Sequence, residues 1–207
     1  MRDVPLCILI TTVWAYWLGV AAMVVRVRRR NRRPVGIVPE QRRERFMWLI
    51  WAPLVSLWVV LPVRALNSTQ ALLALPSFAR DNEAYATARG IAAALAVAAL
   101  ALTVICWLRM GDDWRMDVGA RKTALITDGL FARVRHPIYA LSMLLMVCSL
   151  IIVPTWAMGI IAAVHLTLMN LKARNEETHL AQMHGESYVR YMEQTGRFVP
   201  RLSTRTQ

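Results

Sequence analysis

Long apolar blocks alternate with short polar stretches along this chain. The blocks cover residues 5–25, 46–66, 91–110, 138–153 and 155–171. An α-helix needs roughly 20 apolar residues to cross the hydrocarbon core of a bilayer, which is about 30 Å thick. The pattern therefore predicts an all-α polytopic membrane protein with five transmembrane helices.

The last two blocks are the shortest, and Pro154 separates them. Proline interrupts a helix because it lacks an N–H and its ring clashes with a preceding carbonyl. We therefore expect the two helices to form a tight hairpin, followed by a short helical tail in the cytoplasm. We divide the chain into residues 1–110, with the first three helices, and residues 111–207, with a polar loop, the hairpin over 138–171 and the tail.

The charged residues indicate how the helices are oriented. The chain is 57% hydrophobic with a net charge of +12, and 21 of its 25 Lys and Arg residues lie in 26–45, 109–135 and the segment after 171. Cytoplasmic loops of membrane proteins carry such an excess. We expect an external N-terminus, a cytoplasmic C-terminus and a location in a bacterial inner membrane. The first block is too long for a signal peptide, and the arginines behind it favour a retained helix.

The positive charge is interpreted as contact with membrane lipids, because the arginines flank apolar blocks and face anionic headgroups. No aromatic or recognition-helix pattern accompanies them, so we expect no nucleic-acid partner. Cys7, Cys106 and Cys148 lie in apolar blocks without metal-ligand spacing, so we expect a packing role and no metal.

A polar cluster, Arg135-His136-Pro137-Ile138-Tyr139, stands where the fourth apolar block begins. Proline suits the first position of a helix. The amides of the residues after it lack partners in the helix, and with the helix dipole they attract anions. Together with the positive charge of Arg135, this helix start predicts a binding site for a carboxylate or a phosphate.

A second polar cluster, Glu176-Glu177, follows the fifth block. Carboxylates near a helix C-terminus oppose the dipole, so we expect a cation beside them. That cation is either a side chain, such as Lys172, Arg174 or Arg135, or a cationic ligand. His165, at membrane depth, has either a functional role or a hydrogen bond to a neighbouring helix.

From residue 111 to residue 202 the chain resembles the isoprenylcysteine carboxyl methyltransferase and phospholipid methyltransferase superfamily of membrane enzymes. The matching motifs are LITDGLF at 125–131, RHPIY at 135–139, EETHL at 176–180, GESY at 185–188 and RFVPR at 197–201. Two positions depart from the family pattern, because Leu141 replaces a usual Gly and His184 replaces a frequent Phe.

The resemblance implies an enzyme with S-adenosylmethionine as cofactor. His136, Pro137, Tyr139 and Tyr188 would then line the cofactor pocket, and Glu176 or Glu177 would meet the ammonium or the ribose hydroxyls. The resemblance also implies catalytic roles for Arg135, His136 and Arg197, with one of the two arginines facing a cofactor or substrate carboxylate.

The expected reaction is methyl transfer to a lipid or a lipidated small molecule at the cytoplasmic face, with carboxyl O-methylation as one form. The acceptor atom is O, N or S, and an amine or thiol would need a base such as His136 or His165. We expect no obligate protein partner. The alternatives are a membrane reductase of the steroid-reductase kind that uses a nicotinamide cofactor, and a membrane protein without enzymatic activity.

Overall fold

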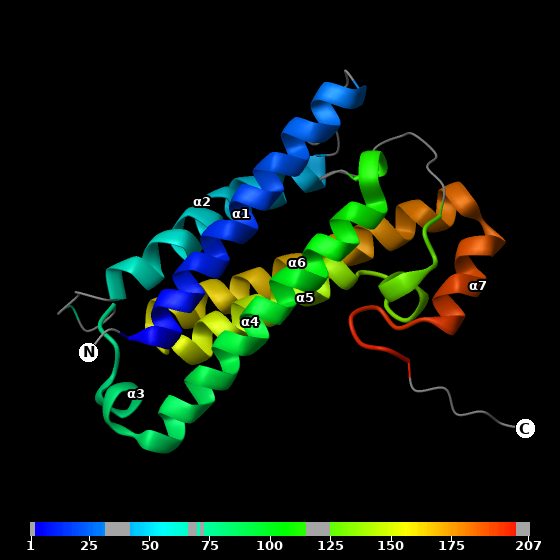
Figure 1. Ribbon diagram of the computed structural model, residues 1–207. Coiled ribbons are helices and arrows are strands. Elements are labelled where there is room, and N and C mark those ends of the chain that lie inside the picture. The colour runs from blue at the N-terminus through cyan, green and yellow to red at the C-terminus, as the bar shows by residue number, and fades with distance from the viewer. Residues whose placement is uncertain (1–2, 32–41, 66–69, 71–72, 115–124, 202–207) are drawn as a thin grey trace, which may run out of the picture.

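The computed structural model describes residues 3–31, 42–65, 70, 73–114 and 125–201 (Figure 1). Over these residues the chain is helical and forms no β-strand, as predicted. The helices are α1 (Val4–Asn31), α2 (Arg42–Ala65), α3 (Ser77–Asp81), α4 (Glu83–Met110), α5 (Pro137–Ile152), α6 (Trp156–His184) and α7 (Glu186–Gln194). Short 3₁₀ turns lie at Gly111–Asp113 and Gly129–Ala132.

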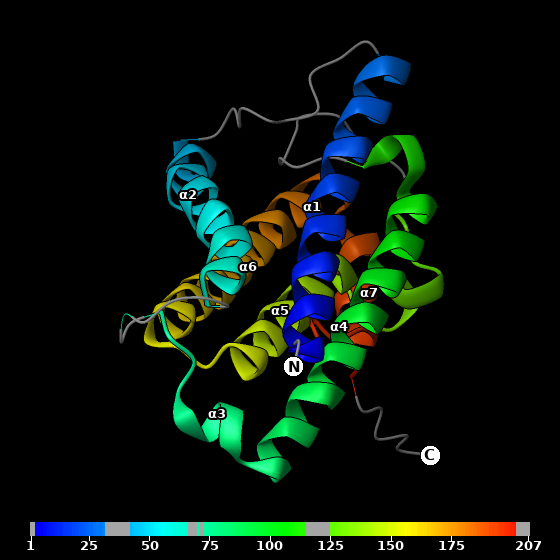
Figure 2. The ribbon, with the colours of Figure 1, turned by 60° about the vertical axis from the view of Figure 1, so that its left-hand side comes forward.

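Helix α5 lies in the middle of the bundle, in contact with α4 and α6, while α1 packs on α4 and α2 packs on α6. Leu145 and Met146 of α5 are fully buried in the apolar core. In the view of Figure 2, α1 and α2 lean apart toward their arginine-rich ends. Helix α7 lies at the far end of α6 from the α5–α6 turn (Figure 1).

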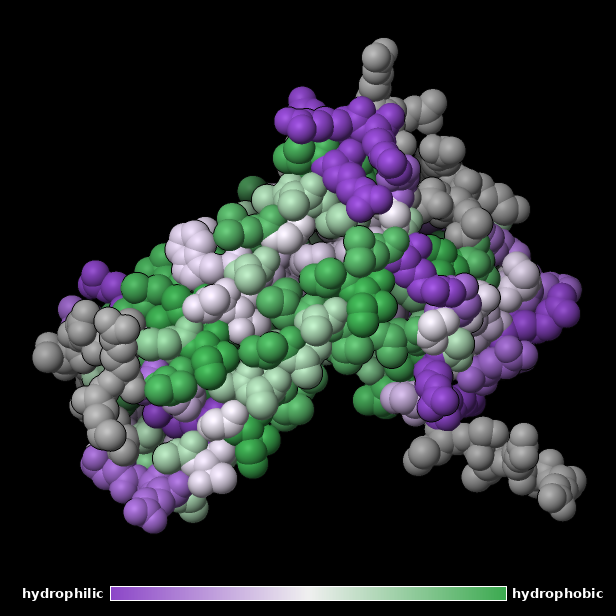
Figure 3. Space-filling model, in the orientation of Figure 1, coloured by the Kyte–Doolittle hydropathy of each residue, from purple (hydrophilic) through white to green (hydrophobic). Residues whose placement is uncertain are grey.

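Among the helices of the described residues, α1, α2, α4 and α6 are long and apolar enough to cross a membrane. Figure 3 shows apolar side chains over the middle of the bundle and hydrophilic ones at its ends. The chain is an integral membrane protein. Helix α5 has 16 residues, or about 24 Å at 1.5 Å per residue, so the fifth crossing stays a prediction.

The predicted hairpin is present as α5 and α6, with the turn at Val153, Pro154 and Thr155. The Thr155 side chain accepts a hydrogen bond from the Met158 amide and so caps α6. Helix α6 runs 13 residues past the predicted end of the apolar block, from Leu171 to His184. Glu176 and Glu177 therefore lie within a continuous helix.

Arg89 of α4 holds the C-terminal end of α5 in place. Its guanidinium donates to the carbonyl of Ile152, 3.0 Å away, and to the carbonyl of Ala79, and it forms a 2.6 Å ion pair with Asp3. Tyr85, one turn earlier, donates to the carbonyl of Ile151. The carbonyls of Ile151 and Ile152 have no partner within α5, and they would be costly to leave unpaired in a bilayer.

Candidate functional site

The start of α5 is joined to the C-terminal segment by a short stretch of backbone pairing. The amide of Arg135 donates to the carbonyl of Gly196 at 2.8 Å, and that of His136 donates to the carbonyl of Arg197 at 3.1 Å. The chain turns so tightly at Gly196 that a Cβ there would lie 1.7 Å from the Val199 carbonyl oxygen. Arg197, 61 positions after His136 in the sequence, is thereby brought beside it.

Glu177 is the centre of the charge network. Its carboxylate lies 2.9 Å from Nε of Arg135 and 2.6 Å from Nη2 of Arg197, and only 7% of the residue is exposed. Nε2 of His136 lies 3.4 Å from Oε1, an ion-pair distance without hydrogen-bond geometry. The cation expected beside this carboxylate is thus supplied by the protein, by Arg135 as proposed and also by Arg197.

Glu176 binds the other side of His136. It accepts a 2.8 Å hydrogen bond from the hydroxyl of Tyr139, and its Oε2 lies 3.3 Å from His136 Nδ1. The His136 and Tyr139 rings are parallel within 2°, with centroids 5.4 Å apart. Burial lowers the pKa of His136, but Glu176 and Glu177 raise it by more, so the net shift is upward and favours an imidazolium.

Arg135 also fixes the position of α7. Its Nη1 donates to the carbonyl of Met192 at 3.0 Å and to the carbonyl of Thr195, which closes the end of that helix. The Tyr191 hydroxyl donates to the carbonyl of Phe131 at 2.6 Å, and burial raises the pKa of this hydroxyl to about 12. Helix α7 and the residue after it are thus tied to the segment before α5 by the hydrogen bonds of Arg135 and Tyr191.

A cavity of about 250 Å³ opens beside this network. Six of the predicted site residues line it: Arg135, His136, Pro137, Tyr139, Glu176 and Tyr188. The other two, Glu177 and Arg197, stand behind them and are not among the described lining residues. Their contacts hold Arg135 and His136 in place, and their predicted roles toward ligands stay predictions.

Tyr188 offers the cavity a polar group. The residue is 1% exposed, and its hydroxyl has no hydrogen-bond partner within the described part of the chain. Burial and the Glu177 carboxylate raise the pKa of this hydroxyl, so it stays protonated and can donate. An unpaired buried hydroxyl is costly, which makes Tyr188 a candidate ligand-binding donor.

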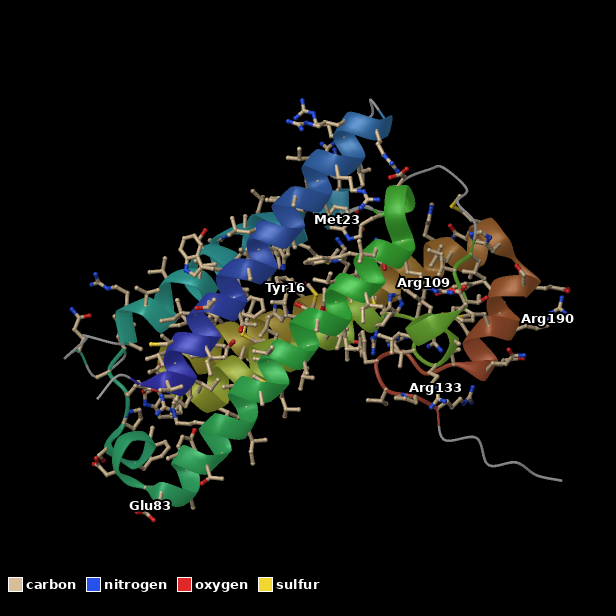
Figure 4. All side chains as sticks on the ribbon, in the orientation of Figure 1. Tyr16, Met23, Glu83, Arg109, Arg133 and Arg190 are labelled. Atoms are coloured by element: carbon tan, nitrogen blue, oxygen red, sulfur yellow. The ribbon has the colours of Figure 1, made fainter. Side chains whose placement is uncertain are left out.

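Much of the remaining cavity lining is aromatic, and residues that the sequence did not single out contribute to it. They come from α1, α2 and α4: Trp17, Glu44, Trp48, Trp51 and Trp107. Tyr16, which also lines the cavity, lies midway along α1 (Figure 4). Tryptophans are common at membrane interfaces, so their presence gave no signal of a site. Glu44 is 2% exposed. In the sequence it lies between arginines, and nothing there marked it as a buried residue.

Three further expectations can be compared with the structure. The amide of Ala140 donates to the carbonyl of His136, so this predicted free donor is already paired. His165 Nε2 lies 3.1 Å from Ser142 Oγ of α5, the hydrogen bond between helices that was one of its two interpretations. Of the two departures from the family pattern, His184 lines the cavity, whereas Leu141 is not among the described lining residues.

The composition of the cavity limits its ligands. Over the residues that the structure describes, no group of three His, Cys, Asp or Glu side chains is placed to hold a metal ion. Its lining instead combines the guanidinium of Arg135 and the carboxylate of Glu176 with many aromatic and aliphatic side chains. Such a cavity can bind a zwitterion through its charged groups and an apolar chain against its rings.

Comparison with known proteins gives one family. A model of the phospholipid methyltransferase family matches residues 87–187, nearly half of the chain. The matched segment includes most of α4, all of α5 and α6, and the start of α7. A search of curated proteins found no significant match.

Proposed function

We propose that the chain transfers a methyl group from S-adenosylmethionine to a lipophilic acceptor at the cytoplasmic face of the membrane. The match of residues 87–187 to the phospholipid methyltransferase family supports this proposal, as do the motifs that resemble membrane methyltransferases. The family favours this function over a nicotinamide-dependent reductase and over a protein without enzymatic activity. The observation that carries the proposal is the cavity lined by Arg135, Glu176 and Tyr188.

The charged groups that line the cavity match those of this cofactor. Its methionine part carries a carboxylate and an ammonium, which match the guanidinium of Arg135 and the carboxylate of Glu176. The unpaired hydroxyl of Tyr188 supplies a further donor. Tyr139 and His136 add stacked aromatic faces beside these charges.

When bound, S-adenosylmethionine supplies a methyl group on a positively charged sulfur, whose leaving group departs neutral. The chain itself contributes binding and orientation, which can lower a two-reactant barrier by roughly 7–11 kcal/mol at best. Glu177 contributes indirectly, because it fixes the guanidinium of Arg135 and the imidazole of His136. Arg135 and His136 directly precede α5, and Glu177 lies on α6.

Proton removal depends on the acceptor. A carboxylate acceptor has no proton to lose, whereas an amine or a thiol has one. The upward shift of its pKa keeps His136 protonated between two carboxylates, so it is poorly suited to accept a proton while that arrangement lasts. His165 is bonded to Ser142 and is not among the described lining residues of the cavity. We therefore propose an acceptor that needs no proton removal by either histidine.

Calorimetry of the full chain in detergent with S-adenosylhomocysteine tests the proposal. We expect saturable binding that weakens by about ten-fold or more in Glu177→Gln, since loss of this carboxylate frees Arg135 and leaves it without its buried partner. Asp128→Asn is the matched control, because it neutralises an exposed carboxylate that pairs with Arg109 outside the network. Its binding should equal that of the wild type.

Absence of binding at millimolar ligand by a folded wild-type protein contradicts the proposal. Equal affinity in wild type and Glu177→Gln contradicts the role of the charge network while leaving the cofactor itself in place.

A further inference from the structure

Glu44 brings a second carboxylate into the cavity from outside the family match. It lies in the first turn of α2 and precedes the matched segment 87–187. The residue is 2% exposed and lines the cavity, as Glu176 does. Its Oε1 accepts a 3.3 Å hydrogen bond from Nδ2 of Asn175, the residue before Glu176 on α6. Helices α2 and α6 thus each bring a carboxylate to the cavity, and the contact between the two helices lies beside both.

The charges of the two carboxylates meet at Tyr139, another lining residue. The negative charge of Glu44 acts through space on the hydroxyl of Tyr139, and that hydroxyl donates to Glu176 at 2.8 Å. Lys172, which lines the cavity one turn before Glu176, is a cation of the protein's own in this region. A ligand cation in the same part of the cavity would be stabilised by both carboxylates.

A role in helix stability alone does not explain where Glu44 lies. A carboxylate in the first turn of a helix is stabilised by the helix dipole, and it gains this benefit on the surface as well. Arg42 and Arg45, on either side of Glu44 in the sequence, are exposed. A buried carboxylate loses its hydration, which an exposed one keeps. The position of Glu44 in the cavity lining therefore points to a role toward a ligand.

We propose that Glu44 recognises the sulfonium of S-adenosylmethionine and so selects the methyl donor over the demethylated product. The inference rests on the proposed function and adds a specificity-determining residue to it. The donor carries an ammonium and a sulfonium that are separated by only three carbon atoms. Glu176 matches the ammonium, and Glu44 matches the sulfonium. S-adenosylhomocysteine has lost the methyl group and the positive charge on sulfur, so only the donor gains from Glu44.

The same charge determines what Glu44 contributes to turnover. The positive charge on sulfur decreases as the methyl group departs, so a carboxylate beside it stabilises the bound donor more than the transition state. Glu44 is therefore a binding residue and not a catalytic one. Its effect is to favour replacement of the product by a new donor molecule after each reaction.

Calorimetry of the full chain in detergent, with S-adenosylmethionine and with S-adenosylhomocysteine, tests the assignment. We expect the wild type to bind the donor more tightly than the product. Two unit charges about 10 Å apart, at an effective dielectric constant of about 20, correspond to roughly a ten-fold effect on affinity. Glu44→Gln should therefore reduce the preference for the donor about ten-fold. The extra methyl group contributes equally in both proteins, so the change in preference reports the charge.

Two further variants locate the effect. Glu44→Asp keeps the charge and should retain most of the preference for the donor. Asp128→Asn removes an exposed carboxylate that pairs with Arg109 and is not among the described lining residues of the cavity. It should keep the wild-type preference. Melting temperatures of the same samples separate a structural role, which would lower the melting temperature of Glu44→Gln and leave the preference unchanged.

Equal affinity of the wild type for donor and product overturns the inference, even if no variant folds. An unchanged preference in folded Glu44→Gln overturns it as well, because Glu44 then does not recognise the sulfonium. An equal loss of preference in Asp128→Asn also contradicts it, since the effect is then not local to the cavity. Failure of the wild type to bind either ligand contradicts the proposed function, whereas binding of both without dependence on Glu44 contradicts only this assignment.

Discussion

At the scale of single residues, His136 determines how the site responds to pH. Its pKa is raised above the ordinary value of 6.5 by Glu176 and Glu177, despite the opposing effect of burial. A histidine whose pKa is higher in the folded state stabilises that state while it is protonated. This contribution is fully present below about pH 6.5 and is lost as the pH rises through the raised pKa. The wild-type melting temperature should therefore fall from about pH 6 to about pH 9.

Thermal unfolding in detergent over this pH range checks the prediction. His136→Gln should flatten the dependence, and Glu176→Gln should reduce it, because one of the two carboxylates that favour the imidazolium is gone. If the melting temperature falls equally steeply with pH in wild type and His136→Gln, the pH dependence comes from another group.

At the scale of elements, the short helix α5 depends on Arg89 of α4. Arg89 is 5% exposed and binds the carbonyl of Ile152 and the carboxylate of Asp3. Arg89→Leu leaves that carboxylate without its cation and the carbonyl without its donor, so it should cost about 3 kcal/mol or more. Arg89→Lys keeps the charge but not the planar fork, so its loss should be intermediate.

Tyr85→Phe is the control within the same helix. It removes one hydrogen bond, to the carbonyl of Ile151, and should cost about 1 kcal/mol. Denaturant unfolding of the purified variants gives the three values. A loss in Arg89→Leu no greater than that in Tyr85→Phe would show that the end of α5 does not depend on the arginine.

At the scale of the whole molecule, the distribution of charge predicts the topology. Because 21 of 25 basic residues fall on one side of the predicted spans, a reporter fused after Arg201 should be active only in the cytoplasm. A reporter inserted at Pro154 should be external if α5 crosses the bilayer. An external reporter at Arg201 would contradict the predicted orientation of the C-terminus. A cytoplasmic reporter at Pro154 would show that α5 does not cross, which leaves three crossings if the Arg201 reporter is cytoplasmic and four if it is external.

The sequence by itself predicted the helical class, the hairpin at Pro154 and the two polar clusters that bracket it. These features are local, because apolar length, proline and charge act within one segment. The sequence also named the six predicted residues that line the cavity. It did so through motifs, in which residues near each other in the chain remain near each other in the fold.

Contacts between distant segments were decided only by the tertiary structure. Backbone pairing brings Arg197 to His136, so that Glu177 is paired with two arginines, Arg135 and Arg197. Trp17, Trp48 and Trp51 line the cavity because of how α1 and α2 pack. The sequence does not decide this, since a tryptophan in a membrane helix can face lipid, core or cavity with the same local pattern. Which of these it faces depends on every neighbour in space, and the order of residues along the chain does not contain that information.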